Sequence, residues 1–362
     1  MTELDFLDAR DQGFPTESDF FQYIENEVDI GKVDGNVNII GSVNNYPDRR
    51  MFLKAIEDGF EPIWGDGDLR LVAGHTRDRS IPYYVYFDQD FPVFITTANI
   101  TKEMPPTIEA FLESDPHLGR FWLSMEQVER MRRQIVRKYQ DVIIPFFTGH
   151  RSKYSEIPAE KRGDIERTIS YWAEDGRETY KEMRAKYGVL PTNIRFERPN
   201  NFKFGIKQEG IFTHQNGSIT DVLELLQQER DSKQYIKDVI NSGGFGESES
   251  QVFPNHKISA SSPWGITANG DSELLSSDAL KTFKVRLQED RWKFGVSEYN
   301  RVGDPGFNAE LVDDIGYSRT QMRGYDDSVR VYPLDRNDID SQFRIFNFVQ
   351  DHFDSSCRAI EV

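Results

Sequence analysis

Apolar residues recur along the first 150 residues in two different periods. Short apolar runs such as Asn36–Val43 and Tyr83–Phe87 predict strands, whereas stripes at helical spacing over Ser18–Val28 and Asp48–Ile56 predict helices. Strands that alternate with helices are typical of an α/β layer. The pattern therefore predicts an α/β domain over residues 1–150.

A polar stretch that begins at Ser152 interrupts this pattern. Apolar stripes then predict two helices, Ile165–Ala173 and Glu178–Tyr187, and two extended runs follow them, Asn193–Glu197 and Asn201–Lys207. Helix, turn, helix and a two-stranded hairpin is the element order of a winged helix-turn-helix. We therefore expect residues 151–245 to form a central helical segment with a winged-helix-like hairpin.

A segment rich in glycine and serine, Asn241–Gln251, marks the next boundary. Most apolar runs beyond it are short and strand-like, for example Trp292–Val296 and Phe343–Val349. The pattern predicts a β-rich α+β domain over residues 252–362.

The composition places limits on the class of protein. The chain has 362 residues, with 61 acidic and 44 basic side chains and a net charge of −17. Only 16 of the basic residues are lysines, and this acidic, lysine-poor balance favours a salt-adapted, halophilic cytoplasm; an ordinary acidic protein is the alternative. The single cysteine, Cys357, excludes an internal disulfide. With no long apolar run and an acidic start, we expect a cytoplasmic protein that does not contact membranes.

Basic residues gather in one part of this acidic chain. The window from Arg130 to Lys207 contains 18 arginines and lysines but 10 acids, a net +8 that leaves −25 for the remainder. Clustered basic side chains bind nucleic acid because they displace the counterions condensed on its phosphates. The window therefore predicts a DNA-binding surface.

The predicted second helix and hairpin supply the candidate DNA contacts. Tyr180, Met183 and Tyr187 share one face of that helix, which leaves its basic residues for a major groove. The candidates are Arg177, Lys181, Arg184 and Lys186 on the helix and Arg195, Arg198 and Lys203 on the wing. An ordinary solvated face, or a surface for RNA or another polyanion, explains the same residues.

Two similar short motifs, each with a histidine and a nearby arginine, follow predicted strands. His75 and Arg77 come after one strand, and His150 and Arg151 after another. Strand ends in open α/β sheets meet at the ligand crevice, and arginine binds phosphate or carboxylate, so these residues are a candidate site for a small anion. Coincidence and histidine-based phosphoryl chemistry are the alternatives.

Two carboxylates also lie near the first of these motifs in the sequence. Asp66 and Asp68, with His75, could hold Mg²⁺, but alternating glycine and aspartate is more typical of a turn. We therefore predict no metal, no cofactor and no catalytic residue.

The layout of residues 36–140 resembles a known family. The strand NVNIIGSV, the helix DRRMFLKAIEDG, the hairpin PYYVYFDQDFPVFITT, the helix TIEAFLESD and the strand RFWLS follow one another. This order resembles the catalytically inactive phospholipase D-like sensor half of archaeal TrmB-type transcription regulators. The resemblance implies a small-molecule sensor attached to a DNA-binding module.

Three hypotheses of function follow. The first is a DNA-binding transcriptional regulator with a sensor domain, acting as a homo-oligomer. The second is a phosphodiesterase or nuclease-like enzyme that uses Asp66, Asp68, His75 and His150. The third is a viral or scaffolding assembly protein.

Overall fold

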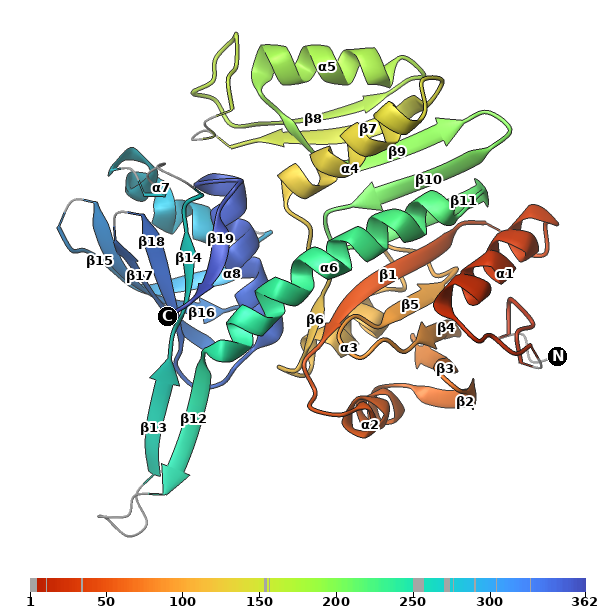
Figure 1. The fold of residues 1–362 in the computed structure, drawn as a ribbon, viewed down its shortest axis with the longest axis horizontal. Helices are drawn as coiled ribbons and strands as arrows, with labels where there is room; N and C mark the ends of the chain where they lie inside the picture. Colours follow the sequence, from red (N-terminus) through yellow and green to blue (C-terminus); the bar gives the residue numbers. More distant parts are fainter. Residues whose placement is uncertain are drawn as a thin grey trace. The chain divides into compact units, whose positions relative to one another are not determined.

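The computed structural model divides the chain into two compact units. The first comprises most residues up to Arg230, and the second most residues from Asp231 to Val362. Figure 1 traces the elements of both units. The structure describes residues 5–10, 12–33, 35–152, 155, 157–249, 257–269, 274–275, 277–289, 291–303, 305–325 and 327–362.

The first unit is built on one eleven-stranded sheet. Its strands follow the order β2-β3-β4-β5-β1-β11-β10-β9-β7-β8, β6 pairs with the carboxyl end of β1, and every pairing is antiparallel. The strands are β1 (Val37–Asn44), β2 (Glu61–Asp66), β3 (Leu69–His75), β4 (Ser80–Tyr86), β5 (Val93–Thr96), β6 (Leu118–Arg120), β7 (Ile143–Arg151), β8 (Arg167–Trp172), β9 (Leu190–Arg198), β10 (Phe202–Lys207) and β11 (Ile211–Gly217).

Helices of this unit begin at residues that cap them. Thr16 and Ser124 each form a capping box, and the Asp48 side chain accepts the Met51 N–H, so the first orphan amides are satisfied. The helices are α1 (Glu17–Asp29), α2 (Arg49–Gly59), one π-helical turn η1 (Pro105–Glu109), α3 (Ala110–Glu113), α4 (Met125–Lys138), α5 (Gly176–Tyr187) and α6 (Thr220–Ser242).

The strand register gives the sheet one largely apolar face. A row of directly paired side chains crosses nine strands through Leu71, Tyr84, Ile95, Ile39, Phe212, Ile206, Ile194, Phe147 and Tyr171. Helices cover this row: the ring of Phe20 in α1 lies 5.6 Å from that of Tyr84, and the ring of Tyr180 in α5 lies 5.2 Å from that of Phe147.

The opposite face changes character halfway across the sheet. Its row runs through Val85, Phe94, Ile40, Ile211, Lys207, Asn193, Thr148 and Ser170. Up to Ile211 these side chains belong to an apolar core that includes Phe52 and Ile56 of α2 and Phe111 of α3. From Lys207 onward the row is polar. One half of this face is therefore core, and the other half lacks an apolar covering.

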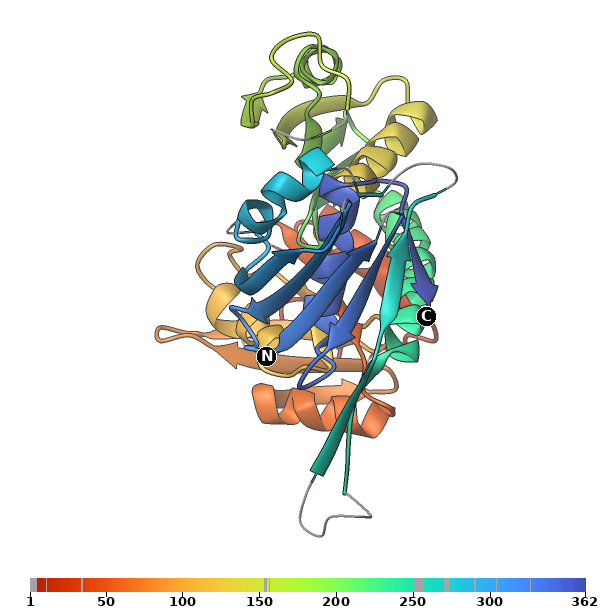
Figure 2. The same ribbon diagram turned by 90° about the vertical axis from the view of Figure 1, so that its left-hand side faces the viewer.

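The second unit contains a six-stranded antiparallel sheet in the order β15-β16-β17-β18-β14-β19 and a two-stranded ribbon, β12-β13. In Figure 2 the strands of the larger sheet stand in front of α8. The elements are β12 (Gly244–Glu249), β13 (Lys257–Ser262), β14 (Trp264–Thr267), α7 (Ser277–Leu287), β15 (Phe294–Arg301), β16 (Gly306–Asp313), β17 (Arg319–Tyr325), β18 (Ser328–Pro333), α8 (Ile339–His352) and β19 (Arg358–Glu361).

A buried arginine organises the core of this unit. Arg344 of α8 is fully buried, and its guanidinium donates to Asp340 and Asp313, each at 2.7 Å, and to the carbonyl of Trp292 at 2.6 Å. Carboxylate and carbonyl acceptors compensate the cost of removing this cation from water. The network ties α8 to the sheet. Among the described residues, no helix combines the length and apolar character needed to cross a membrane.

In coarse outline, the prediction of mixed helices and sheets with a β-rich last region is confirmed. The run Phe343–Val349, which was expected to be strand-like, instead lies in helix α8. The predicted hairpin after Pro191 is also present, because β9 and β10 pair antiparallel.

The predicted helix over Ile165–Ala173 is wrong. Arg167–Trp172 forms β8, in which Ile169 and Tyr171 are less exposed than Thr168, Ser170 and Trp172 on either side. The burial period is two because the segment pairs with β7, whereas Ile165, Ile169 and Trp172 alone also fit a helical stripe. Without this first helix, the described residues between β7 and the hairpin form no helix-turn-helix.

The predicted domain boundaries also need correction. The boundary at residue 150 falls inside β7, and strands from both sides of it share one sheet. The central segment 151–245 is therefore no separate domain, and α6 runs unbroken across the division between Arg230 and Asp231. The boundary predicted between 245 and 252 lies partly outside the described residues.

His214 makes the stability of the first unit depend on pH. Its ring on β11 is fully buried, neither ring nitrogen has a hydrogen-bond partner among the residues that the structure describes, and burial lowers its pKa from 6.5 to about 4. Between pH 6.5 and about pH 4 the His214 ring is protonated in the unfolded chain but neutral in the folded chain. The free energy of unfolding therefore falls as the pH is lowered through this window. We expect His214→Leu to remove about 3 kcal/mol of this acid sensitivity.

Urea denaturation of both proteins at pH 7 and pH 4.5 measures the effect. An equal loss of stability in wild type and His214→Leu would show that other groups govern the acid response.

Candidate functional site

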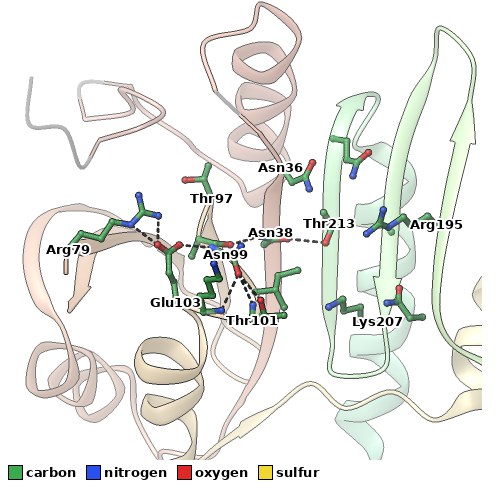
Figure 3. Close-up of a pocket in the computed structure, with 16 residues that line it drawn as sticks. Asn36, Asn38, Arg79, Thr97, Asn99, Thr101, Glu103, Arg195, Lys207 and Thr213 are labelled. Carbon is green, nitrogen blue, oxygen red and sulfur yellow. Dashed lines mark hydrogen bonds and ion pairs between the residues drawn. The ribbon is translucent and has the colours of Figure 1, made fainter. Parts of the chain in front are cut away.

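A polar pocket opens where the apolar half of the sheet face ends. Its volume is about 580 Å³, within the range of small-molecule sites. The floor consists of strands β1, β11, β10 and β9, and the wall is the segment after β5, residues 97–103. Figure 3 shows Arg79 and Glu103 on the side of this segment, and Arg195 and Lys207 on the strands opposite.

Hydrogen bonds hold the wall in one conformation. The Asn99 side chain accepts the N–H groups of Thr101 and Lys102, which forms a tight turn. Glu103 accepts the Asn99 N–H at 2.7 Å and the Arg79 Nε–H at 2.6 Å. The charges of Arg79 and Glu103 therefore compensate each other, and the wall is preformed.

Asn38 joins the wall to the floor. Its amide nitrogen donates to the carbonyl of Ala98 at 3.0 Å, and its oxygen accepts the Thr213 hydroxyl at 2.9 Å. Asn38 is almost fully buried, and both halves of its amide are satisfied. It fixes the distance between the turn and the strands instead of remaining free for a ligand.

A glycine creates the hollow in the floor. Thr213, Gly205 and Arg195 are direct cross-strand partners on β11, β10 and β9. A Cβ atom at Gly205 would lie 3.3 Å from Cγ of Arg195, closer than an ordinary contact. The missing side chain leaves space between two polar strands.

The charge inside the pocket is positive. Within the described part of the chain, Arg195, Lys207 and Lys102 have no carboxylate within 4.0 Å, whereas the lining carboxylate, Glu103, is held by Arg79. Three uncompensated cations around one hollow favour an anionic ligand.

Aromatic rings lie beside these cations. The Arg195 guanidinium is 5.1 Å from the ring centroids of both Phe146 and Trp172, and the two rings are 4.1 Å apart. Trp172 is 65% exposed, which is unusual for so large an apolar side chain. The exposed indole of Trp172 on β8 therefore lies beside Arg195, which lines the pocket.

Of the three predicted wing residues, one reaches the pocket. Arg195 lines it, but Lys203 pairs with Glu197 at 2.9 Å and Arg198 with Asp141 at 2.9 Å. The strand register places Glu197 directly opposite Lys203, and Asp141, two residues before β7, pairs with Arg198, so a carboxylate neutralises each of these two cations.

The predicted recognition helix is a partly internal element. On α5, Arg177 donates to the carbonyl of Gln140 and Arg184 lies 3.2 Å from Glu129, while the Lys186 amine lies over the Tyr187 ring. Lys181, whose side chain is 56% exposed, is 3.9 Å from Glu178. Arg177 and Arg184 are therefore engaged by internal partners and do not both face outward as expected, whereas Lys181 is exposed. DNA contact by these four residues stays a prediction.

The cause is a fully buried carboxylate on α4. Glu129 accepts two hydrogen bonds from Arg132, at 2.7 and 2.8 Å, and one from the Tyr180 hydroxyl at 2.8 Å. Burial and the nearby carboxylate raise the pKa of Tyr180 well above 10. The basic excess of this region partly serves to neutralise an internal charge.

The two histidine–arginine motifs lie far apart in the structure. His75 ends β3 and His150 lies near the end of β7, and six strands separate β3 from β7. At about 4.8 Å per strand the separation is roughly 34 Å. The prediction failed because it assumed parallel strands, whose ends meet at one edge.

Local contacts account for several of these residues. Arg151 is buried and donates to the carbonyls of Ile157, Gly163 and Gly188, so it is not free to bind an anion. His75 pairs with Glu61 at 3.1 Å. Arg77 lies in the exposed turn between β3 and β4.

The four residues named in the enzyme hypothesis do not come together. Asp66 and Asp68 lie at the β2–β3 turn, where Arg49 pairs with Asp68, far from His150. In the portion of the chain that is described, no three His, Cys, Asp or Glu side chains gather to hold a metal ion.

Sequence reasoning missed Lys207, Lys102, Asn38 and Gly205. The alternation in FKFGIK, with Lys203, Gly205 and Lys207 on one face, was the available signal. Lys102 comes from a distant segment, and its approach depends on the tertiary fold.

Comparisons with known proteins place this region in context. The model of the AF_0896_M family middle domain matches residues 126–209, which include Arg195, Gly205 and Lys207. A protein of Archaeoglobus fulgidus named "Uncharacterized protein" is 23% identical over 359 residues, covering 95% of each chain. No solved structure matches the chain significantly.

Charge reversal on α5 separates internal from exposed cations. We expect Arg184→Glu to lower the free energy of unfolding by about 2 kcal/mol or more, because it places a carboxylate beside buried Glu129. Lys181→Glu, at an exposed position, should change it by about 0.5 kcal/mol. Urea denaturation measures both, and equal values would show that Arg184 is as peripheral as Lys181.

Proposed function

We propose that this protein is a ligand-sensing regulator whose eleven-stranded unit binds a small anionic ligand of the nucleotide class. The observation that carries the proposal is the pair Arg195 and Lys207, two cations without carboxylate partners beside the hollow at Gly205. An anion that enters this pocket replaces water around charges that the described residues leave uncompensated.

The pocket has the size and lining of a recognition site for a polar metabolite. Amides of Asn193, Asn36 and Gln215 surround the cations, and a volume of about 580 Å³ suits a mononucleotide better than a bare phosphate ion. These groups donate and accept hydrogen bonds but form no pair of nucleophile and base. The lining therefore favours binding over catalysis.

Trp172 supports a ligand with a planar ring. Its exposed indole lies on β8 beside Arg195, at the border of the pocket. A phosphate held by Arg195 and Lys207 would leave the attached base within reach of this aromatic face, and base–aromatic stacking contributes about 1–3 kcal/mol. The resemblance of residues 36–140 to the sensor half of transcription regulators is consistent with a sensing role.

The ligand is tested by thermal unfolding with nucleoside monophosphates. Compounds that bind the folded chain raise its midpoint, whereas nucleosides and ribose 5-phosphate, which each lack half of the recognised groups, should raise it less. In Arg195→Gln and Lys207→Gln we expect affinity for the nucleotide to fall at least about tenfold, because each loses a charge-assisted hydrogen bond.

Lys181→Gln is the matched control, since it removes an exposed cation from α5 and should leave affinity unchanged. The proposal fails if no nucleotide shifts the midpoint, or if all three variants bind nucleotide as wild type does.

A second test fills the pocket without changing charge. Gly205→Val adds an apolar side chain to the floor of the hollow, where the flexible Arg195 side chain, 3.3 Å from the new Cβ, must shift slightly and the strand backbone itself suits valine. We expect the variant to fold and to lose nucleotide binding. Thr148→Val, on β7 outside the lining, is the control, and isothermal titration calorimetry measures both. Undiminished binding by Gly205→Val would exclude this pocket.

A further inference from the structure

The six-stranded sheet of the second unit also has two different faces. Thr320 and Met322 of β17 are buried, and Gln342 of α8 donates to the Thr320 hydroxyl, so one face packs against α8. The alternate residues, including Arg323 and Tyr325, are partly or fully exposed. Helices thus cover one face, and side chains on the other meet solvent.

Two arginines stand directly opposite each other on this uncovered face. Arg323 of β17 and Arg330 of β18 are cross-strand partners, an arrangement in which like charges repel. Neither has a carboxylate within 4.0 Å among the described residues, and Arg358 of β19 has none either. An anion that bridges the pair would remove the repulsion and gain charge-assisted hydrogen bonds.

Two glutamates of this face lie on other strands, and Asp327 lies in the turn between β17 and β18. Glu310 and Glu298 face each other on β16 and β15, and Glu310 is 3.9 Å from Arg319. The strands from β17 to β19 therefore form the basic half of the face, although the chain as a whole has a charge of −17.

Aromatic rings accompany the arginines. The Arg323 guanidinium lies 4.9 Å from the ring centroid of Tyr332, and Tyr325, two residues along the same face, is 48% exposed. Beside Arg330, the side chains of Ile360 and Val362 lie over Gly265 of β14, so the face is apolar at this point. Cations that follow a backbone and rings on which bases stack are the two elements of single-strand recognition.

We propose that the uncovered face of this sheet, defined by Arg323, Arg330, Arg358 and Tyr325, binds single-stranded nucleic acid. The proposal concerns a different surface from the nucleotide pocket and does not depend on it. The arginines would contact phosphates, and Tyr325 would stack on a base. An acidic peptide would satisfy the arginines but would leave the tyrosine without a role, so the ring favours nucleic acid.

Fluorescence anisotropy of the full chain with a labelled oligothymidylate, measured over a range of KCl concentrations, tests the proposal. Loss of two phosphate contacts in Arg323→Gln/Arg330→Gln should weaken binding at least about tenfold at low salt, and should reduce the salt slope by about 0.7 per contact. Tyr325→Ala should weaken binding and leave the salt slope unchanged, because stacking releases no counterions.

The matched control is Lys284→Gln/Lys293→Gln, which removes two exposed cations from α7 and from the residue before β15. It should bind as wild type does, and so should Lys207→Gln in the nucleotide pocket. The proposal is overturned if the oligonucleotide does not bind at low salt, if the arginine double variant binds it normally, or if a polyglutamate peptide binds this face more tightly.

Discussion

Side chains on antiparallel strands alternate between the two faces of a sheet, and the register of the eleven strands therefore decides which residues meet helices and which meet solvent. One row, from Leu71 to Tyr171, is apolar throughout and holds the helices on its face. The neighbouring row changes from Ile211 to Lys207 in a single step between paired strands. A slip of one residue would bury the cations of β10 and expose its apolar side chains.

The same alternation accounts for the position of the pocket. The core around Phe94 and Phe111 ends at β11, and the segment that follows β5 forms a wall over the first polar strands. A ligand at this boundary contacts a preformed turn on one side and the ends of strand side chains on the other. Gly205 matters because it leaves space at this boundary.

Internal neutralisation explains why the basic window overstated the candidate surface. Glu129 pairs with Arg132 and Arg184. Arg198 pairs with Asp141, Lys203 with Glu197, and Lys138 with both Asp221 and Glu224. A count of charges along the chain includes all of these cations equally. Only the fold separates them from Arg195 and Lys207, which keep their charge available on an uncovered face.

Short stretches of the sequence were enough to predict several helices and strands of this fold. Apolar stripes predicted helices at the positions of α1 and α2, and two extended runs after Pro191 predicted the β9–β10 hairpin, because these features depend on neighbours in the chain. Tertiary structure alone decided that Ile169 belongs to a strand, that His75 and His150 lie far apart, and that Lys102 approaches Lys207. The physical reason is that strand order and register join segments more than 100 residues apart, as in the pairing of Asn38 with Thr213, and no local pattern encodes which segments meet.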